Sequence, residues 1–382
     1  MSDVTLCSKC ILDSSIPSIR FDSQGVCNYC KIQDRMAEQH PLNADSEKKL
    51  HGFVQQIKKD GKRKPYDCIV GVSGGVDSSY VLHLTKKLGL RPLAVHMDNG
   101  WDSELAVSNI KKIITKLGVD LHTVVLNWEE FKDLQISFLK ASVPDTEMPT
   151  DFAIEAVLFK VAAQKKISYI ISGQSFRTEG KVPIYWNYGD WKYITSIYRL
   201  FGKKKKLKSY PKFSLFDRFY SAIVHRTKSI RFLYYINYNK KEVQTFLEKE
   251  FGWTNYVAKH YESIYTRFHH AYLLPRKFNI DLRKAYFSGE VRFHQMTREE
   301  ALKEIKKLPL SQDQIEKDKE YVIKKLGLSS EEFEKIMVLP SKTFMDYPSY
   351  FPFIKRFLKP IKFVYRLVSP NVPATFHEME YL

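Results

Sequence analysis

A short stretch rich in glycine and serine at residues 73–78 directly follows the apolar run 66–72. Between a strand and a helix, such a turn directs several backbone N–H groups at one anion, and the helix dipole strengthens the attraction. No lysine stands where the triphosphate-binding loop G-x-x-x-x-G-K-[ST] requires one, so another type of phosphate loop is indicated. A carboxylate fits here when Mg²⁺ bridges it to the phosphates. The candidate residues are Ser73, Gly74, Gly75, Val76, Asp77 and Ser78.

Four cysteines near the start of the chain form two C-x2-C pairs separated by sixteen residues. This spacing is typical of a four-cysteine zinc ribbon, in which four thiolates enclose one ion. A closed ligand set leaves no position for a substrate, so the zinc is predicted to be structural; redox chemistry and an iron–sulfur cluster are lesser alternatives. Cys68, inside the apolar run, is interpreted as a small core residue. The predicted ligands are Cys7, Cys10, Cys27 and Cys30.

The segments that must position these residues alternate between strand and helix patterns. This alternation predicts an α/β fold with a doubly wound parallel sheet, whose ligands bind beyond the carboxyl ends of the strands. Three loops fall at that edge, at residues 73–78, 98–101 and 173–179. Strands are predicted at 66–72, 91–97, 120–126 and 167–173, and helices at 78–89, 103–118 and 151–166.

Composition limits the class of protein and of its partners. Of the 382 residues, 44% are hydrophobic and 14% aromatic, which excludes a disordered chain. The net charge of +18 favours anionic partners: nucleic acid, nucleotide-bearing substrates, acidic proteins or a membrane surface. The first ten residues contain no apolar signal core, and no stretch reaches the length of a spanning helix, so a cytoplasmic protein is expected.

Three regions are predicted: a cysteine knuckle over 1–40, a nucleotide-binding α/β domain over 60–200, and a basic, mostly helical region over 201–382. The basic aromatic tail at 345–370 is interpreted mainly as a segment packed on the body. Its lysines beside apolar residues also permit contact with a membrane surface. Helix starts in the third region are indicated by the pairs Thr297 with Glu300, Ser311 with Gln314, and Ser329 with Glu332.

The sequence GVSGGVDSS at 71–79 resembles the PP-loop of the ATP pyrophosphatases, which cleave ATP between its α and β phosphates. The resemblance implies an adenine nucleotide alpha hydrolase-like fold and a loop that holds the β and γ phosphates, with Mg²⁺ between them. Two further strand ends are implied to contact nucleotide or Mg²⁺. The third loop departs from the family pattern, with glutamine and serine where asparagine is usual. The implied residues are His96, Asp98, Gly173, Gln174 and Glu179.

Read together, stretches from Cys7 to about Leu308 resemble the N-acetyl sugar amidotransferases of bacterial surface-polysaccharide and lipopolysaccharide synthesis. They include CSKCILDSSIPSIRFDSQGVCNYC, NWEEFKDLQISFLKAS and GWTNYVAKHYESIYTRF. The implied reaction transfers AMP to the carbonyl oxygen of an N-acetyl group on a nucleotide-activated sugar. Ammonia then displaces AMP and leaves an acetamidino group. The enzyme must position the reactants, neutralise charge and exclude water.

The resemblance also suggests site residues outside the nucleotide loops. The sequence KHYES at 259–263 offers side chains for the sugar or for developing charge, although charged pairs at this spacing commonly decorate helix surfaces. Two tryptophans and an aspartate are weaker candidates for the substrate pocket. Together with Asp77, the catalytic candidates are Lys259, His260 and Glu262, and the substrate candidates are Trp101, Trp186 and Asp190.

The chain lacks the residues for making ammonia from glutamine. Residue 2 is serine, so no N-terminal cysteine nucleophile is present, and the other cysteines are assigned to metal or to a buried strand. A separate glutaminase is therefore predicted, with an ammonia-conducting subunit like those of imidazole glycerol phosphate synthase. No DNA partner is predicted.

Two other functions use the same features. A tRNA-thiolating enzyme shares the loop, the paired cysteines and the positive charge, but it needs a sulfur-carrying cysteine or cluster beyond one zinc site. A zinc-ribbon binding module with a degenerate nucleotide domain is the non-enzymatic alternative. The intact residues at 73–78 argue against such degeneracy.

Overall fold

The computed structural model describes residues 4–256, 261–368 and 372–382. Five short strands form one sheet at its centre: β1 (Cys68–Gly71), β2 (Pro92–Asp98), β3 (Leu121–Val125), β4 (Tyr169–Ser172) and β5 (Lys228–Arg231). Their order is β3-β2-β1-β4-β5, and every neighbouring pair is parallel. Because the order reverses at β1, a ligand crevice is expected at the carboxyl ends of β1 and β4.

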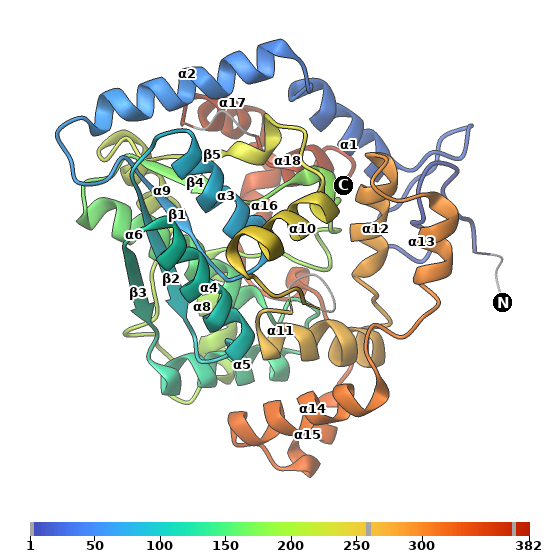
Figure 1. Ribbon diagram of the computed structural model, residues 1–382. Coiled ribbons are helices and arrows are strands. Elements are labelled where there is room, and N and C mark those ends of the chain that lie inside the picture. Colours follow the sequence, from blue (N-terminus) through green and yellow to red (C-terminus); the bar gives the residue numbers. More distant parts are fainter. Residues whose placement is uncertain (1–3, 257–260, 369–371) are drawn as a thin grey trace.

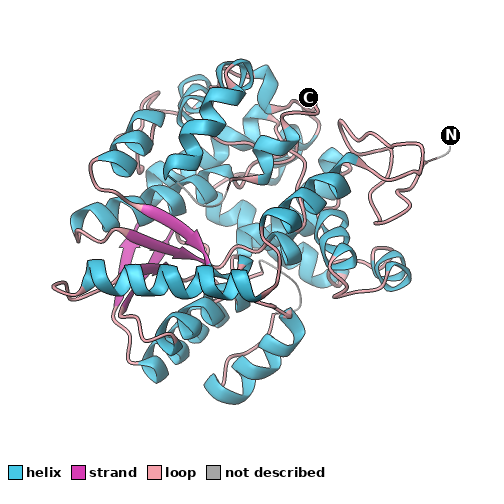
Figure 2. Cartoon of the chain, turned by 90° about the horizontal axis from the view of Figure 1, so that it is seen from above, coloured by secondary structure: helices cyan, strands magenta, loops and turns pink. Residues whose placement is uncertain are grey.

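Both faces of the sheet are covered by helices, as Figure 2 shows from above. Successive residues of β1 point into different hydrophobic clusters: Ile69 into one, Cys68 and Val70 into the other. The predicted doubly wound sheet is therefore confirmed. The helices of the first face are α5 (Trp128–Ala141), α6 (Met148–Gln164) and α8 (Trp191–Phe201), and those of the second are α2 (Ala44–Gly61), α3 (Val76–Lys87), α4 (Glu104–Leu117) and α10 (Lys240–Phe251).

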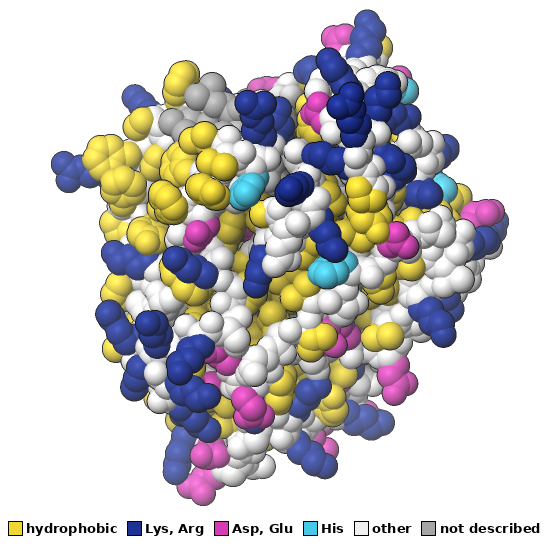
Figure 3. Space-filling view, turned by 90° about the vertical axis from the view of Figure 1, so that its left-hand side faces the viewer, with side chains coloured by type: hydrophobic (Ala, Val, Ile, Leu, Met, Phe, Trp, Pro, Cys, Tyr) yellow, Lys and Arg dark blue, Asp and Glu magenta, His cyan; other side chains and the backbone are white. Residues whose placement is uncertain are grey.

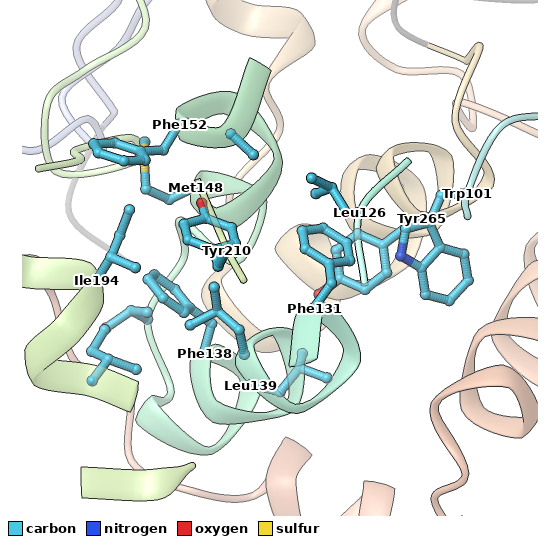
Figure 4. Packing of buried hydrophobic residues seen from close by; sticks show 14 of the residues in the cluster. Trp101, Leu126, Phe131, Phe138, Leu139, Met148, Phe152, Ile194, Tyr210 and Tyr265 are labelled. Atoms are coloured by element: carbon cyan, nitrogen blue, oxygen red, sulfur yellow. The ribbon is translucent and has the colours of Figure 1, made fainter. Parts of the chain in front are cut away.

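The first face carries the larger aromatic core (Figure 4). Phe138 of α5 and Phe152 of α6 lie in this core with Ile194 of α8 and Tyr210, which follows α8 in the chain. The Phe152 and Tyr210 rings are stacked, with centroids 6.4 Å apart. Burial of side chains of this size is the main stabilising term of such a core.

The sheet continues beyond the boundary that the sequence predicted at residue 200. In β5, Arg231 lies opposite Ser172 of β4, so the sheet takes its last strand from the basic region. The pattern of this strand is KSIR, with one apolar side chain, Ile230, fully buried. One apolar residue is too weak a signal for a strand, which is why the sequence did not indicate it.

The chain after β5 is mostly helical, as predicted (Figure 1). The capping boxes at Thr297 and Ser329 are confirmed, and Ser311 accepts the N–H of Gln314 as an N-cap. The remaining helices are α1 (Asn28–Gln39), α7 (Phe176–Glu179), α9 (Leu215–Ile223), α11 (Ile264–Phe268), α12 (Arg283–Arg292), α13 (Arg298–Glu304), α14 (Gln312–Leu326), α15 (Ser330–Met337), α16 (Phe351–Arg356), α17 (Leu358–Val368) and α18 (Ala374–Glu378), with 3₁₀ turns at Phe232–Tyr234 and Phe344–Asp346 and a π-helical segment at His269–Phe278.

The N-terminal knuckle packs against the C-terminal helices, beside α12 and α13 in Figure 1. The Arg298 guanidinium donates to the carbonyl oxygens of Cys7 and Cys10 at 3.0 and 3.1 Å. The Tyr29 hydroxyl of α1 donates to Glu378 at 3.1 Å. The knuckle is therefore integrated with the helical region. Within the described residues, no helix has the length and apolar character needed to cross a membrane.

Candidate functional site

The loop at 73–78 joins the carboxyl end of β1 to the start of α3, as the sequence predicted. The Ser78 hydroxyl accepts the N–H of Ser73 at 3.2 Å and donates to the carbonyl of Gly75 at 3.1 Å. The Ser78 side chain thus links the two ends of the turn by hydrogen bonds. The first turn of α3 begins at Val76, so the N–H groups that make no bond within the helix and the positive end of the helix dipole both point toward the loop.

Backbone atoms of other segments lie close to two glycines at this site. Gly74 has φ +82°, and a Cβ on it would lie 2.6 Å from the carbonyl oxygen of Ala106 in α4. A Cβ on Gly173, at the end of β4, would lie 3.0 Å from backbone atoms of Asp77. The nucleotide loop is thus enclosed by backbone on two sides, and its conformation depends on the absence of side chains.

Replacing Gly74 with alanine is expected to distort the loop and weaken ATP binding at least ten-fold. The left-handed conformation alone costs a non-glycine residue ~1–3 kcal/mol, before the clash with Ala106 is counted. Calorimetric titration with ATP measures the change. Gly52→Ala is the control, because a Cβ there has no neighbour within 4 Å and helix α2 accepts alanine well. Equal ATP affinity in a folded Gly74→Ala protein would contradict the assignment of the loop.

Aromatic side chains from the third region contact the loop from outside. The Trp253 indole N–H and the Tyr256 hydroxyl both donate to the carbonyl of Gly74, at 2.9 and 3.2 Å. The Tyr238 hydroxyl donates to Oδ1 of Asp77. The sequence analysis did not single out these three residues, although Trp253 and Tyr256 lie inside the stretch GWTNYVAKHYESIYTRF. The PP-loop is therefore built jointly by the sheet and by the chain that follows it.

Glu262 reaches the loop through a short antiparallel contact. The N–H of Ser103 donates to the Glu262 carbonyl, and the N–H of Ile264 to the Trp101 carbonyl, both at 2.9 Å. The Glu262 carboxylate then lies against Gly75, where an added Cβ would collide with it. Of the three catalytic candidates at 259–263, this one is brought to the nucleotide loop. Lys259 and His260 lie outside the described residues.

His96, near the carboxyl end of β2, contacts the residue that precedes the loop. The His96 ring contacts two acceptors, the Val72 carbonyl through Nδ1 and Asp102 through Nε2, each at 2.9 Å. Burial lowers the pKa of His96, but the hydrogen bond and charge of Asp102 outweigh it and raise the pKa overall. Both ring nitrogens are therefore used within the protein. Asp98 accepts the N–H of Gly100 at 2.7 Å.

A cation that the sequence analysis missed lies next to the third strand end, on the neighbouring strand β5. Arg231 ends β5, and its Nε donates to Oε1 of Gln174 at 3.0 Å. Glu179, at the end of α7, lies within electrostatic range of Arg231. An arginine guanidinium provides rigid, bidentate donors for an anion. Its strand lacks an apolar pattern, and only the pairing with β4 places it at this edge.

Two carboxyl groups are buried where α6 begins. The Asp145 carboxylate accepts the Tyr193 hydroxyl at 2.9 Å, and burial raises its pKa to about 7. Glu147 accepts the Thr266 hydroxyl at 2.8 Å, and burial, assisted by the charge of Asp151, raises its pKa to about 8. Both groups therefore titrate in the neutral range. The bond from Thr266 of α11 connects Glu147 with the segment that carries Glu262.

The raised pKa of Asp145 predicts a pH dependence of stability. Below the unfolded-state pKa, near 3.8, both states are protonated; between that value and about 7 only the folded state holds the proton. The free energy of unfolding should therefore fall as the pH rises through this window, and Asp145→Asn should flatten the fall. Urea unfolding at several pH values between 5 and 8 measures the slope. The exposed Asp45→Asn is the control, and an unchanged slope in Asp145→Asn would contradict the prediction.

The three substrate candidates lie in structural positions. Trp101 is 0% exposed, donates to Gln135 at 2.6 Å and packs on Tyr265, as Figure 4 shows. Trp186 is buried in the apolar cluster beneath the cysteine knuckle. Asp190 is the N-cap of α8 and is buried. Their side chains are thus engaged in packing and capping.

The four predicted cysteine ligands come together. Their sulfur atoms all lie within 4.8 Å of one another, with 3.9 Å between Cys7 and Cys30 and 3.8 Å between Cys10 and Cys27. Four thiolates bound tetrahedrally to zinc at ~2.3 Å have sulfurs about 3.8 Å apart, so the set fits the ion. Backbone N–H groups also point at these sulfurs, such as that of Lys9 at Cys7. Cys68 is buried separately in β1.

Purified protein is expected to contain one zinc ion per chain and to lack the visible absorbance of an iron–sulfur cluster. Cys10→Ala should lose the metal and lower the melting temperature, because four-cysteine sites contribute folding energy directly. Elemental analysis and thermal denaturation provide the two readouts. Cys68→Ala is the control for metal content and should retain zinc. Iron with acid-labile sulfide in the wild-type protein would contradict the zinc assignment.

Two family models match this chain in succession. The model for NAD synthase matches residues 47–208, which contain β1 to β4 and the PP-loop. The model described as LPS biosynthesis protein WbpG-like, C-terminal domain, matches residues 262–362. The second match begins at Glu262, the residue whose carboxylate lies on Gly75.

Curated relatives match over shorter stretches. A probable mitochondrial tRNA-specific 2-thiouridylase 1 of Caenorhabditis elegans is 28% identical over 160 residues, 37% of this chain and 40% of the relative. The tRNA-specific 2-thiouridylase MnmA of Ruthia magnifica is 34% identical over 110 residues, 26% of this chain and 30% of the relative. The chain thus spans less than half the length of these relatives.

Among solved structures, the U34-tRNA thiolase NcsA from Methanococcus maripaludis with its [4Fe-4S] cluster is 12% identical and covers 83% of this chain and 88% of its own. Its TM-score is 0.33, too low to bear on activity.

Proposed function

The chain is a WbpG-like protein of the PP-loop superfamily, and on that premise we propose that it is an ATP-dependent amidotransferase acting on an N-acetylated, nucleotide-activated sugar. The observation that supports this most directly is the position of Glu262. This residue opens the WbpG-like region and lies on the nucleotide loop, so a substrate held by that region would meet the nucleotide there. The match to the NAD synthase model covers the nucleotide loop and supports an ATP-utilising enzyme.

The proposed reaction has two steps. The carbonyl oxygen of the N-acetyl group attacks the α phosphorus, the bond to the β phosphate breaks, and pyrophosphate leaves. Ammonia then adds to the activated carbon, the carbon–oxygen bond breaks, and AMP leaves with the oxygen. The product is an acetamidino group, which takes up a proton at neutral pH. No oxidant or reductant is needed.

Different residues of this chain would have different roles in the reaction. The loop amides and the start of α3 hold the leaving pyrophosphate, and Arg231 adds positive charge beside the third strand end. Mg²⁺ would be held by Asp77 and the phosphates and would neutralise their charge. Glu262 lies beside the loop, in a position to orient the acceptor or to accept a proton. Trp253 and Tyr256 hold the loop in place by their bonds to Gly74.

The deciding experiment mixes the full chain with Mg-ATP, ammonium and a panel of N-acetylated nucleotide sugars, followed by mass spectrometry of both products. AMP, pyrophosphate and a sugar that has exchanged oxygen for NH are expected. Glu262→Gln should bind ATP normally but form AMP about 100-fold more slowly. The exposed Glu248→Gln is the matched control. A nucleotide that remains uncleaved with every sugar would refute the proposal.

A second candidate is tRNA thiolation, because both curated relatives described above are tRNA-specific 2-thiouridylases. It requires a sulfur-carrying cysteine or a cluster beyond one zinc site, whereas the described cysteines are four grouped ligands and one buried thiol, Cys68, whose pKa is raised by burial. AMP formation without a change in the sugar, together with salt-sensitive retention of tRNA, would favour this candidate.

We further propose that ammonia is supplied by a separate glutaminase through an ammonia-conducting subunit. The support is the cysteine inventory: Cys7, Cys10, Cys27 and Cys30 are grouped together, and Cys68 is 0% exposed. The isolated chain should use ammonium and not glutamine. Release of glutamate by the chain alone would overturn this part of the proposal.

A further inference from the structure

Helix α9 turns its apolar side toward solvent. Phe216, Phe219, Tyr220 and Ile223 follow the i, i+3, i+4, i+7 spacing that normally faces a core, yet all four are exposed, Phe216 by 74% and Ile223 by 67%. The buried side of the helix is represented by Ser221. An amphipathic helix whose apolar side faces solvent exposes a stripe of apolar side chains.

The C-terminal helices add to this surface. Phe353 and Phe357, one helical turn apart, are exposed by 55% and 43%, and Phe363 of α17 is exposed by 66%. The two parts are connected, because Tyr365 of α17 lies within electrostatic range of the Arg218 guanidinium of α9. We refer to α9 with α16 and α17 as the aromatic surface.

Figure 3 views the molecule from the left-hand side of Figure 1, where α9 lies. Hydrophobic side chains gather in the upper left of this view, and lysines and arginines lie around them. The picture agrees with the exposed residues named above in placing apolar and basic groups together.

Cations strongly outnumber acids in these segments. The sequence holds no acidic residue from 347 to 377, and Asp217 is the only one from 191 to 241. Asp217 is used locally in the capping box with Ser214. The exposed cations of these segments include Lys212, Arg226, Lys228, Lys355, Arg356, Lys359 and Arg366.

We propose that the aromatic surface docks this protein on a lipid bilayer that contains anionic headgroups. The phenylalanines would enter the boundary between headgroups and acyl chains, while the surrounding lysines and arginines pair with the negative headgroups. A run of cations almost without acids complements an anionic plane. Docking goes beyond the proposed function and does not depend on it, because none of the exposed aromatic residues named here belongs to the nucleotide loop.

Vesicle flotation of the full chain tests the proposal. Vesicles of phosphatidylcholine with phosphatidylglycerol should carry the protein to the top of the gradient, and vesicles of phosphatidylcholine alone should leave most of it behind. Added salt should weaken the binding. Equal flotation with both vesicle types, or with neither, would overturn the proposal.

Matched variants separate the two contributions. The double change Phe216→Ser with Ile223→Ser should weaken vesicle binding about ten-fold, as should Lys355→Gln with Lys359→Gln. The control is Leu308→Ser with Val338→Ser, since these side chains are 67% and 79% exposed but lie outside the aromatic surface. Wild-type flotation of both test variants would refute the assignment. So would a stable dimer that the Phe216 and Ile223 changes dissolve, because the surface would then belong to a second copy of this chain. All variants should retain their metal content, which confirms that they fold.

Discussion

The contact on which the site depends is the short antiparallel apposition between residues 101–103 and 262–264. Its two backbone hydrogen bonds, each 2.9 Å long, bring the start of the WbpG-like region to the carboxyl edge of the sheet. This contact positions the Glu262 carboxylate against Gly75. The nucleotide loop and the region after it are thus parts of one site, although almost two hundred residues separate them in the chain.

The loop itself is a backbone structure held by many partners. Gly74 and Gly173 allow main chain to approach main chain, and the carbonyl of Gly74 receives both Trp253 and Tyr256. The two hydrogen bonds to its carbonyl and the close packing around its Cα restrict the backbone conformation of Gly74. Such prior ordering reduces the cost of arranging donors around phosphates when the nucleotide binds.

Charge is unevenly distributed, and the distribution separates the chain's surfaces. Near the site, acids and cations are mixed: Glu179, Arg231 and Gln174 contact or influence one another. On α9 and the C-terminal helices, cations and phenylalanines occur almost without acids. The net charge of +18 is a property of the whole chain, and composition alone did not show that its cations outnumber acids so strongly on α9 and the C-terminal helices.

Local pattern alone determined the PP-loop, the four cysteine ligands and the alternation of strands and helices, because turns, ligand spacing and periodicity are encoded by neighbouring residues. Tertiary structure alone decided that Glu262 meets the loop, that Arg231 joins the third strand end through β5, and that Trp101 is core. It also decided that the apolar side of α9 faces outward, since periodicity reveals an amphipathic helix but not which side is covered. These outcomes depend on which distant segments pack together, and burial and strand pairing between remote residues leave no fixed spacing in the sequence.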